Sequence, residues 1–220
     1  MNVFSPNSWL GRFFYLVADI VTLHFLWLLC SLPIVTIGAS TTALYYCMMK
    51  RMRRDEGYAT SNFFSSFKAN FFQATILWLA VVLIAFLLFL DAKIGLFLGG
   101  IMGNIFLFIS SILGLLFLFT LLYLFPVQAK FENRIIDNVK NAFLMSLSNF
   151  GYTMLLLLLN VSFVLFAVLS TFVVGVYLVC GAGFYAFLTS GIYVMVFRKY
   201  LPDELSADIE ASGIDPNKLM

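Results

Sequence analysis

The sequence predicts an all-α, polytopic helical membrane protein. Hydrophobic residues make up 62% of the 220 residues and charged residues only 11%, and the mean hydropathy is +0.99. A soluble domain has about 45–50% apolar and about 25% charged residues. A soluble chain of this length could not bury so much apolar surface, so this chain requires lipid as a solvent. The composition excludes a soluble enzyme, a disordered chain and a secreted disulfide scaffold.

Long stretches without any charged residue locate the later membrane spans. They are Phe71–Leu90, Ile94–Val127 and Gly151–Phe197, with 20, 34 and 47 residues. A helix needs about 20 apolar residues to cross the hydrocarbon core of a bilayer. The first two stretches therefore predict one span each, and the third predicts two spans joined by a tight turn within residues 170–175. The predicted spans cover 71–90, 101–126, 151–171 and 176–197.

The first apolar segment, residues 13–49, is interrupted and allows two topologies. Pro33 removes a backbone donor, and Gly38 introduces a second break five residues after it. The interpretation that the sequence favours is one kinked span over 13–37, which gives five spans in total. The alternative is a two-pass or re-entrant hairpin over 13–49, which gives six spans.

Basic residues gather between the spans and predict the orientation of the chain. Lys50–Lys68 contains five basic residues, Val127–Asn149 contains three, and Arg198 and Lys199 follow the last span. The loop 91–93 contributes only one basic residue. Short loops rich in Lys and Arg stay in the cytoplasm. We therefore expect one transmembrane domain, 1–200, with these basic segments and a short acidic tail, 201–220, in the cytoplasm.

Phenylalanines recur at helical spacing just before the second predicted span. Phe63, Phe64, Phe67 and Phe71 form this stripe, and a similar stretch precedes the fourth predicted span. An apolar stripe of this kind beside a polar face is typical of an amphipathic helix that lies in the membrane interface. The sequence therefore predicts interfacial amphipathic helices in addition to the spans.

Among the polar residues inside the predicted spans, four are candidates for a specific role: Asp19, His24, Asn104 and Asn160. Asp19 is interpreted either as an interfacial carboxylate stabilised by a helix N-terminus or as a transport or partner contact. His24 is five residues from Asp19, about 140° around a helix, so the two are not expected to form an acid–base pair. Asn104 and Asn160 are expected to form hydrogen bonds between helices.

Three glycines at a spacing of four residues open the third predicted span. Gly95, Gly99 and Gly103 would lie on one helix face and allow a second helix to approach closely. The alternative interpretation is a loosely helical, glycine-rich entry from the preceding loop.

The sequence contains no motif that points to catalysis. Its single histidine and its three cysteines, Cys30, Cys47 and Cys180, have no metal-ligand spacing, and no Walker loop or nucleophile elbow is present. We therefore expect no enzyme activity, no metal and no cofactor. The net charge of +2 is too small to indicate a nucleic-acid partner.

One part of the chain resembles a known family. The resemblance covers roughly residues 4–90 and is most specific in LCSLPIVTIGAST and the basic segment that follows it. These segments are similar to the YesL family of bacterial multi-pass membrane proteins, a domain of unknown function. Family motif positions map onto Ser31, Pro33, Gly38, Ser40, Thr41, Arg54, Glu56 and Gly57. Family members tend to be encoded beside carbohydrate ABC importers, and the family supplies no catalytic residues.

The resemblance implies an accessory membrane protein of a sugar import system in the bacterial cell membrane. Its partners would be membrane lipids and the permease subunits of the importer, which it would help to assemble or regulate. The alternative is that the protein is itself a transporter, either of small solutes or facing lipid. The expected partner-binding residues are Pro33, Gly38, Ser40, Thr41, Arg51, Arg53, Arg54, Phe64 and Phe67.

Overall fold

The computed structural model describes residues 9–53, 58–131 and 133–201, and its regular elements there are all helical. In chain order they are α1 (Trp9–Ser31), a 3-10 turn (Ile34–Thr36), α2 (Ile37–Met52), α3 (Ala59–Leu98), α4 (Gly100–Lys130), α5 (Ile135–Ser148), α6 (Phe150–Leu169), α7 (Thr171–Val176), a π-helical turn (Tyr177–Gly181) and α8 (Ala182–Phe197). The predicted all-α class is confirmed. The predicted acidic tail lies outside the described residues, except for Leu201.

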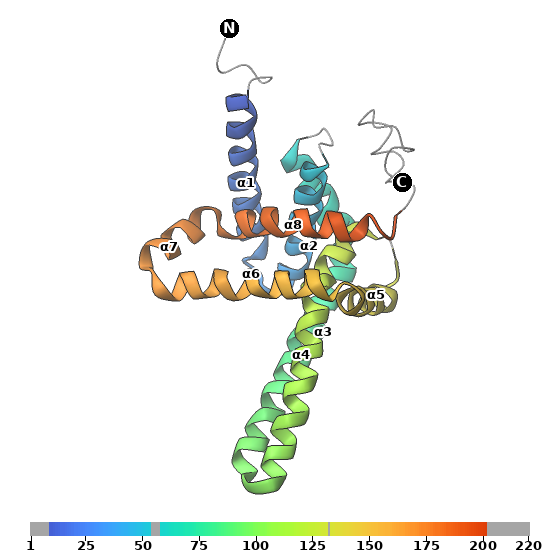
Figure 1. Cartoon of the computed structure of the whole chain (residues 1–220). Helices are drawn as coiled ribbons and strands as arrows, with labels where there is room; N and C mark the ends of the chain where they lie inside the picture. The colour runs from blue at the N-terminus through green and yellow to red at the C-terminus, as the bar shows by residue number, and fades with distance from the viewer. Residues whose placement is uncertain (1–8, 54–57, 132, 202–220) are drawn as a thin grey trace.

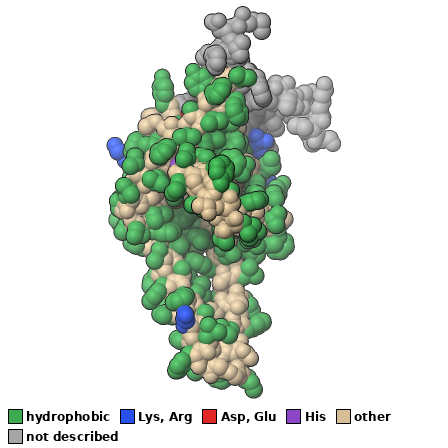
Figure 2. All heavy atoms as spheres, turned by 90° about the vertical axis from the view of Figure 1, so that its left-hand side faces the viewer, with side chains coloured by type: hydrophobic (Ala, Val, Ile, Leu, Met, Phe, Trp, Pro, Cys, Tyr) green, Lys and Arg blue, Asp and Glu red, His purple; other side chains and the backbone are tan. Residues whose placement is uncertain are grey.

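Within the described residues, five helical segments are long and apolar enough to cross a membrane. They are Phe13–Ser31, Ala59–Leu98, Gly100–Lys130, Phe150–Leu169 and Thr171–Phe197. Most of the surface in Figure 2 is hydrophobic, with few charged side chains. Such a surface is unfavourable in water and is compatible with lipid.

The first apolar segment is a helical hairpin and not one kinked helix over 13–37, but it contributes a single candidate span, so the predicted total of five spans is confirmed and the alternative of six is not. Asp19 of α1 contacts Arg51 of α2, and Trp27 of α1 contacts Thr41 of α2, so the two helices run in opposite directions. The 16 residues of α2 rise only about 24 Å, which is less than the hydrocarbon thickness of about 30 Å. The helix α2 is accordingly a buried return helix and is not among the five candidate spans.

The predicted interfacial helix and the second predicted span are one continuous helix of 40 residues, α3. Its sequence has no proline, and its single glycine, Gly95, comes near its end, so nothing interrupts the helical hydrogen bonds between the two parts. Asp91 and Lys93, which were expected in a loop, lie in the last turns of the same helix. The separate interfacial helix expected before the second span therefore does not exist.

The glycine-rich run forms a tight turn between α3 and α4. Gly99 and Gly100 have φ values of +60° and +58°, which glycine adopts without steric strain. Gly95 and Gly103 face each other across the turn, and a Cβ on Gly95 would lie 3.2 Å from the carbonyl oxygen of Gly103. The three glycines therefore allow close packing, but Gly95 belongs to α3, Gly99 to the turn and Gly103 to α4. The prediction that they lie on one face of a single helix is wrong.

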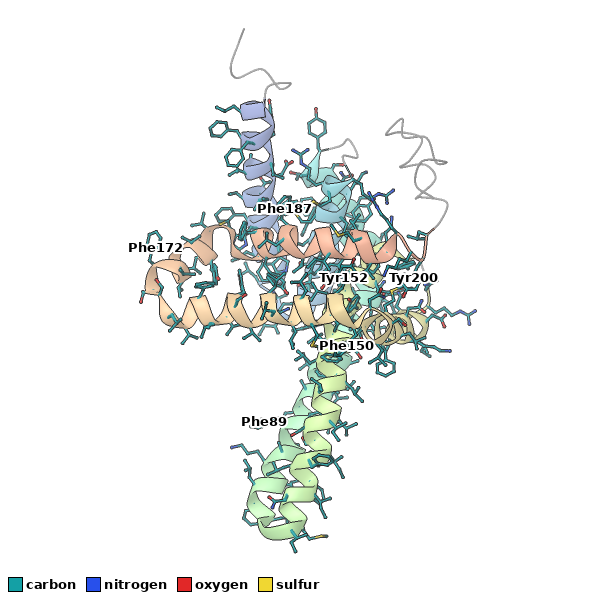
Figure 3. All side chains as sticks on the ribbon, in the orientation of Figure 1. Phe89, Phe150, Tyr152, Phe172, Phe187 and Tyr200 are labelled. Atoms are coloured by element: carbon teal, nitrogen blue, oxygen red, sulfur yellow. The ribbon has the colours of Figure 1, made fainter. Side chains whose placement is uncertain are left out.

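The helices α3 and α4 extend beyond the rest of the molecule as a long hairpin (Figure 1). Phe89, on this hairpin, points away from the protein in Figure 3 and is 56% exposed. Apolar side chains along both helices are similarly exposed, as expected for a segment surrounded by lipid chains.

The helices α6 and α8 lie side by side and run across the direction of α3 and α4 (Figure 1). The predicted turn within 170–175 is confirmed, because α6 ends at Leu169 and Ser170 separates it from α7. Phe172 marks the far end of this turn in Figure 3. The candidate spans therefore do not share one axis, which the hydropathy pattern alone did not indicate.

The predicted interfacial helix before the fourth span is present as a separate helix, α5. Asn149 ends it, with φ −116° and ψ 49°, and its side-chain amide donates to the Met145 carbonyl and to the Tyr200 hydroxyl at 3.1 and 2.9 Å. Lys199 donates to the Asn149 side-chain oxygen at 3.1 Å, and its ammonium lies over the ring of Tyr152. These contacts fix the end of α8 beside the junction of α5 and α6.

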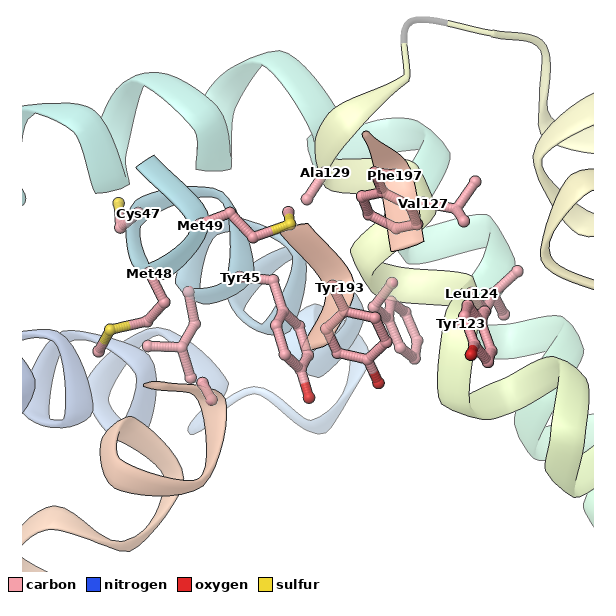
Figure 4. Packing of buried hydrophobic residues seen from close by; sticks show 14 of the residues in the cluster. Tyr45, Cys47, Met48, Met49, Tyr123, Leu124, Val127, Ala129, Tyr193 and Phe197 are labelled. Carbon is pink, nitrogen blue, oxygen red and sulfur yellow. The ribbon is translucent and has the colours of Figure 1, made fainter. Parts of the chain in front are cut away.

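The core forms around α2, which packs against α1, α3, α4 and α8. Tyr193 of α8 lies between Tyr45 of α2 and Tyr123 of α4, with ring centroids 5.5 and 5.6 Å away in edge-on geometry (Figure 4). Its hydroxyl donates to the Leu122 carbonyl at 2.7 Å. Edge-on aromatic pairs add about 0.5–1.5 kcal/mol beyond the burial of their area. The three tyrosines therefore join helices from both halves of the chain.

Gly38 sets the distance between α2 and α3. A Cβ at this position would lie 2.7 Å from the Trp78 Cβ and still closer to the backbone oxygen of Ala74. Real Cβ atoms do not approach other atoms this closely, and a helix backbone cannot move aside as a flexible side chain can. Only glycine therefore permits this packing.

Replacing Gly38 by alanine should destabilise the protein by about 1–3 kcal/mol, because the added methyl group overpacks the contact between α2 and α3. Unfolding of the full chain in detergent, followed by circular dichroism, measures this effect. Gly114→Ala is the matched control, since a Cβ on Gly114 meets no atom within 4 Å and should be neutral or stabilising. Equal stability of the two variants would contradict the proposed role of Gly38.

Candidate functional site

An ion pair closes the open end of the α1–α2 hairpin. The Arg51 Nε lies 3.2 Å from the Asp19 Oδ2, and both side chains are about one third exposed. Beside this pair, Lys50 donates to the side-chain oxygen of Asn62 in α3 at 3.3 Å. Asp19 therefore has a partner within the chain, which neither sequence interpretation foresaw because Arg51 is remote in sequence.

Cys47 lies next to these charged residues, but its environment does not favour a reactive thiol. Its thiol is buried and lies 3.7 Å from the Ala59 carbonyl. Burial raises the pKa of the Cys47 thiol to about 12, against a smaller lowering effect of Lys50. Because the thiolate is the nucleophilic form, burial disfavours reaction at this thiol.

The break at Pro33 forms the closed end of the hairpin, and its backbone groups find partners inside the chain. The Thr36 hydroxyl lies 2.6 Å from the Cys30 carbonyl and 2.7 Å from the Pro33 carbonyl. The Trp78 indole of α3 donates to the Ile34 carbonyl at 2.8 Å. Polar backbone groups at membrane depth require such partners.

The nine residues expected to bind a partner do not form one surface. Pro33 is exposed at the closed end of the hairpin, whereas Arg51 and Arg53 lie at the far end of α2, about 24 Å away by helix rise. Arg54, Glu56 and Gly57 lie outside the described residues.

Several of the remaining expected residues have structural roles. Gly38 and Ser40 are fully buried, and Thr41 accepts a hydrogen bond from Trp27 at 3.1 Å. Phe67 is partly buried against Phe63 of the same helix, with ring centroids 6.2 Å apart. Phe64, the other phenylalanine among the expected residues, is exposed, at 41%. The motif that carries the family resemblance is thus largely a packing motif in this structure.

Besides Asp19, two of the four candidate polar residues contact another helical segment. Asn160 of α6 donates to the Tyr185 hydroxyl of α8, which confirms its expected role. His24 is buried and its Nε2 lies 3.0 Å from the Leu178 carbonyl. Asn104, in contrast, is exposed near the tip of the α3–α4 hairpin, so the expected role between helices is wrong for this residue.

A cluster of four side-chain amides, which the sequence analysis did not identify, joins α3, α4 and α5. Gln128 is its centre and is only 3% exposed. Its amide nitrogen donates to Asn70 at 3.0 Å and to Gln73 at 2.9 Å, and its oxygen accepts from Asn138 at 2.7 Å. We call Asn70, Gln73, Gln128 and Asn138 the amide cluster.

The amide cluster borders a polar cleft of about 440 Å³. The cleft lies between the end of α2, the first part of α3 and the end of α4, and its rim includes Tyr46, Ser65, Ala69, Lys130 and Asn133. Both segments that the charge pattern predicts to be cytoplasmic, 50–68 and 127–149, contribute to it. Hydroxyl, amide and ammonium groups converge there, so the cleft can bind a polar ligand or a polypeptide segment.

Amides in otherwise apolar helices were the signal that could have revealed the amide cluster. Gln73 and Gln128 each lie at one end of a charge-free stretch and would be costly there without partners. Their pairing could not be deduced, because it depends on α3 and α4 lying side by side in this register.

The ion pair can be tested with a double-mutant cycle of Asp19→Asn and Arg51→Gln. We expect the two changes to couple by about 0.5–1 kcal/mol in unfolding free energy, the range for partly exposed pairs. A second cycle with Asp91→Asn in place of Asp19→Asn is the control and should be additive. Additivity of the first cycle would show that the pair does not stabilise the hairpin.

Gln128→Met should lower the unfolding free energy by about 1–3 kcal/mol, because it keeps the side-chain volume but leaves buried amides without partners. Gln128→Glu should be at least as destabilising, since its carboxylate would face the oxygens of Asn70 and Gln73 that now accept from Gln128. Thermal unfolding in detergent measures both. Asn133→Met, on the rim of the same cleft, is the control, and an equal loss there would argue against the amide cluster.

Comparison with known proteins identifies one segment of the chain. No curated protein and no solved structure matches the chain. A family model described as "Protein of unknown function, DUF624" matches residues 20–92. This segment contains most of α1, all of α2 and most of α3, which are the helices that Gly38 and the ion pair hold together. The predicted resemblance to the YesL family is thereby confirmed over residues 20–92, which are similar to the DUF624 family model.

Proposed function

We propose that this protein is a non-catalytic accessory membrane protein that binds permease subunits of a carbohydrate ABC importer and assists their assembly or regulation. The resemblance to the YesL family supports the kind of partner. The polar cleft supports the mode of binding, and it is the observation on which the proposal depends. The cleft, and not the residues expected from the motif, is the proposed contact surface.

The chemistry of the cleft favours a polypeptide as its occupant. Side-chain amides and hydroxyls can pair with both the N–H and the C=O groups of an extended or looped segment. The volume of about 440 Å³ accommodates only a few side chains, which is in keeping with insertion of one loop of a larger partner.

The position of the cleft supports a cytoplasmic contact. Its walls come from the segments whose basic residues predict a cytoplasmic location, and Arg198 and Lys199 follow α8 at the end that is tied to α5. An importer exposes permease loops on that side of the membrane, where it couples to its ATPase subunits. Binding there would leave the apolar hairpin of α3 and α4 to contact lipid.

An independent transporter that faces lipid is the second candidate. A separate cavity of about 470 Å³ between α1, α6 and α8 favours it, because that cavity is lined mainly by apolar and aromatic residues. Flux of a labelled solute or lipid in liposomes that contain this chain alone would support the transporter and contradict the accessory role.

Filling the cleft should abolish partner binding without unfolding the protein. Ala69 lines the cleft and is exposed, so Ala69→Trp places an indole where a partner loop would insert. We expect this variant to lose most of the importer permease subunits that co-purify with the wild type from native membranes. Ala85→Trp is the matched control, because Ala85 is exposed on the same helix and lies about 24 Å further along it.

Two results would contradict the proposal. One is undiminished co-purification of permease subunits with the Ala69→Trp variant. The other is the absence of permease subunits from wild-type eluates under conditions that keep the amide cluster intact, as judged by the unfolding midpoint.

A further inference from the structure

The predicted acidic tail continues beyond Leu201, the last described residue. Residues 202–220 contain one basic side chain, Lys218, and five acidic side chains: Asp203, Glu204, Asp208, Glu210 and Asp215. The segments that the charge pattern predicts to lie on the same side of the membrane are basic. Opposite charges therefore meet on this side, and the place where the tail begins decides which basic surface it meets first.

The acidic tail begins beside the polar cleft. Phe197, the last residue of α8, packs edge-on against Phe131, with ring centroids 5.4 Å apart, and Phe131 lines the cleft. Leu201 follows Phe197 by four residues, which span at most about 14 Å. The first residues of the tail are therefore within reach of the cleft.

Contacts with Asn149 fix the chain at the end of α8. Lys199 donates to the Asn149 side-chain oxygen at 3.1 Å, and the Asn149 amide donates to the Tyr200 hydroxyl at 2.9 Å. A tethered segment acts on a nearby site at an effective concentration on the order of millimolar. Contacts that are too weak to hold a separate peptide can therefore hold the tail.

The polar cleft presents hydrogen-bond donors that the described chain does not use. The hydroxyls of Tyr46 and Ser65 and the side-chain amide of Asn133 line it, and none of the three has a hydrogen-bond partner among the described residues. Each of them can donate to a carboxylate. Because hydrogen bonds to an ionised acceptor are roughly twice as strong as those between neutral groups, a carboxylate is a stronger partner for these donors than a backbone carbonyl.

The surroundings of these donors are positively charged. The described parts of segments 127–149 and 198–201 contain one acidic side chain, Asp137, and five basic side chains: Lys130, Arg134, Lys140, Arg198 and Lys199. Arg134 directly follows Asn133, is exposed and forms no ion pair with a described residue. An acidic segment at the rim of the cleft is therefore attracted by Arg134, whereas a neutral segment is not.

We propose that the acidic tail docks in the polar cleft, where carboxylates from residues 203–210 accept hydrogen bonds from Tyr46, Ser65 and Asn133. The cleft of about 440 Å³ holds only a few side chains, so one short stretch of the tail fills it. The tail then competes with the partner loop for the same groups. This competition rests on the proposed function, whereas the docking does not.

Pulsed electron paramagnetic resonance on the full chain in nanodiscs tests the docking without any importer. One spin label is placed at Val139, which is exposed on α5, and one at Ala207 in the tail. Cys30 and Cys180, the partly exposed cysteines, are replaced by alanine. Docking predicts one narrow distance distribution, because both labels are then held by the same part of the molecule.

Neutralising the tail should release it from the cleft. The neutralised variant carries amides in place of four carboxylates: Asp203→Asn, Glu204→Gln, Asp208→Asn and Glu210→Gln. We expect its distance distribution to become broad and its mean distance to lengthen, since the charge-assisted hydrogen bonds are lost. The matched control exchanges aspartate and glutamate at the same four positions, which keeps every charge, and it should retain the narrow distribution.

Two substitutions test the cleft side of the contact. Ala69→Trp, which fills the cleft, and Arg134→Gln should both broaden the distribution, whereas Lys140→Gln, further along α5, should not. Equally broad distributions in the wild type and in the neutralised variant would overturn the proposal. A narrow distribution that survives Ala69→Trp would place the tail elsewhere and would overturn it as well.

Competition with the partner is measured separately. Neutralising the tail should raise the amount of co-purified permease subunits by at least about twofold, because a tethered competitor is removed. An unchanged amount would overturn the competition. If neither protein brings down permease subunits, the proposed function fails, and the distance measurements still decide the docking.

Discussion

The close contact of α2 with α3 at Gly38 is the constraint on which the other packing depends. The missing side chain lets the α2 backbone approach Ala74 and Trp78, and this position of α2 brings Tyr45 against Tyr193 of α8. Tyr193 in turn reaches α4 through Tyr123 and the Leu122 carbonyl. A chain without the Gly38 contact would have to move α2 outward and lose this aromatic connection between its two halves.

In lipid, apolar burial alone does little to bring helices together, so polar contacts and small residues must supply specificity. The protein follows this rule at several levels. The ion pair and Trp27–Thr41 orient α1 on α2, the amide cluster ties α3 to α4 and α5, and Asn160 joins α6 to α8. The two cavities lie at the margins of these contacts, one polar and one aromatic.

Composition and charge-free stretches were enough to predict the fold class and the approximate position of each later span, because the length of an apolar helix is set by the bilayer. They could not distinguish a kinked α1 from a hairpin, since that choice depends on partners such as Arg51 and Trp78 that are distant in sequence. The motif residues Gly38, Ser40 and Thr41 were identified, but their role is packing. The amide cluster was missed because single amides in apolar runs acquire meaning only from their neighbours in space.

The antiparallel return of α2 along α1 is the central claim, and a distance measurement tests it most directly. Spin labels at Val17 and Lys50, in the full chain in nanodiscs, report the separation of the two helices by pulsed electron paramagnetic resonance. The hairpin predicts a distance on the order of 15 Å, which is one helix spacing plus the label arms. A continuous helix with a mild kink would place the labels about 50 Å apart, and a distance of that size would contradict the account.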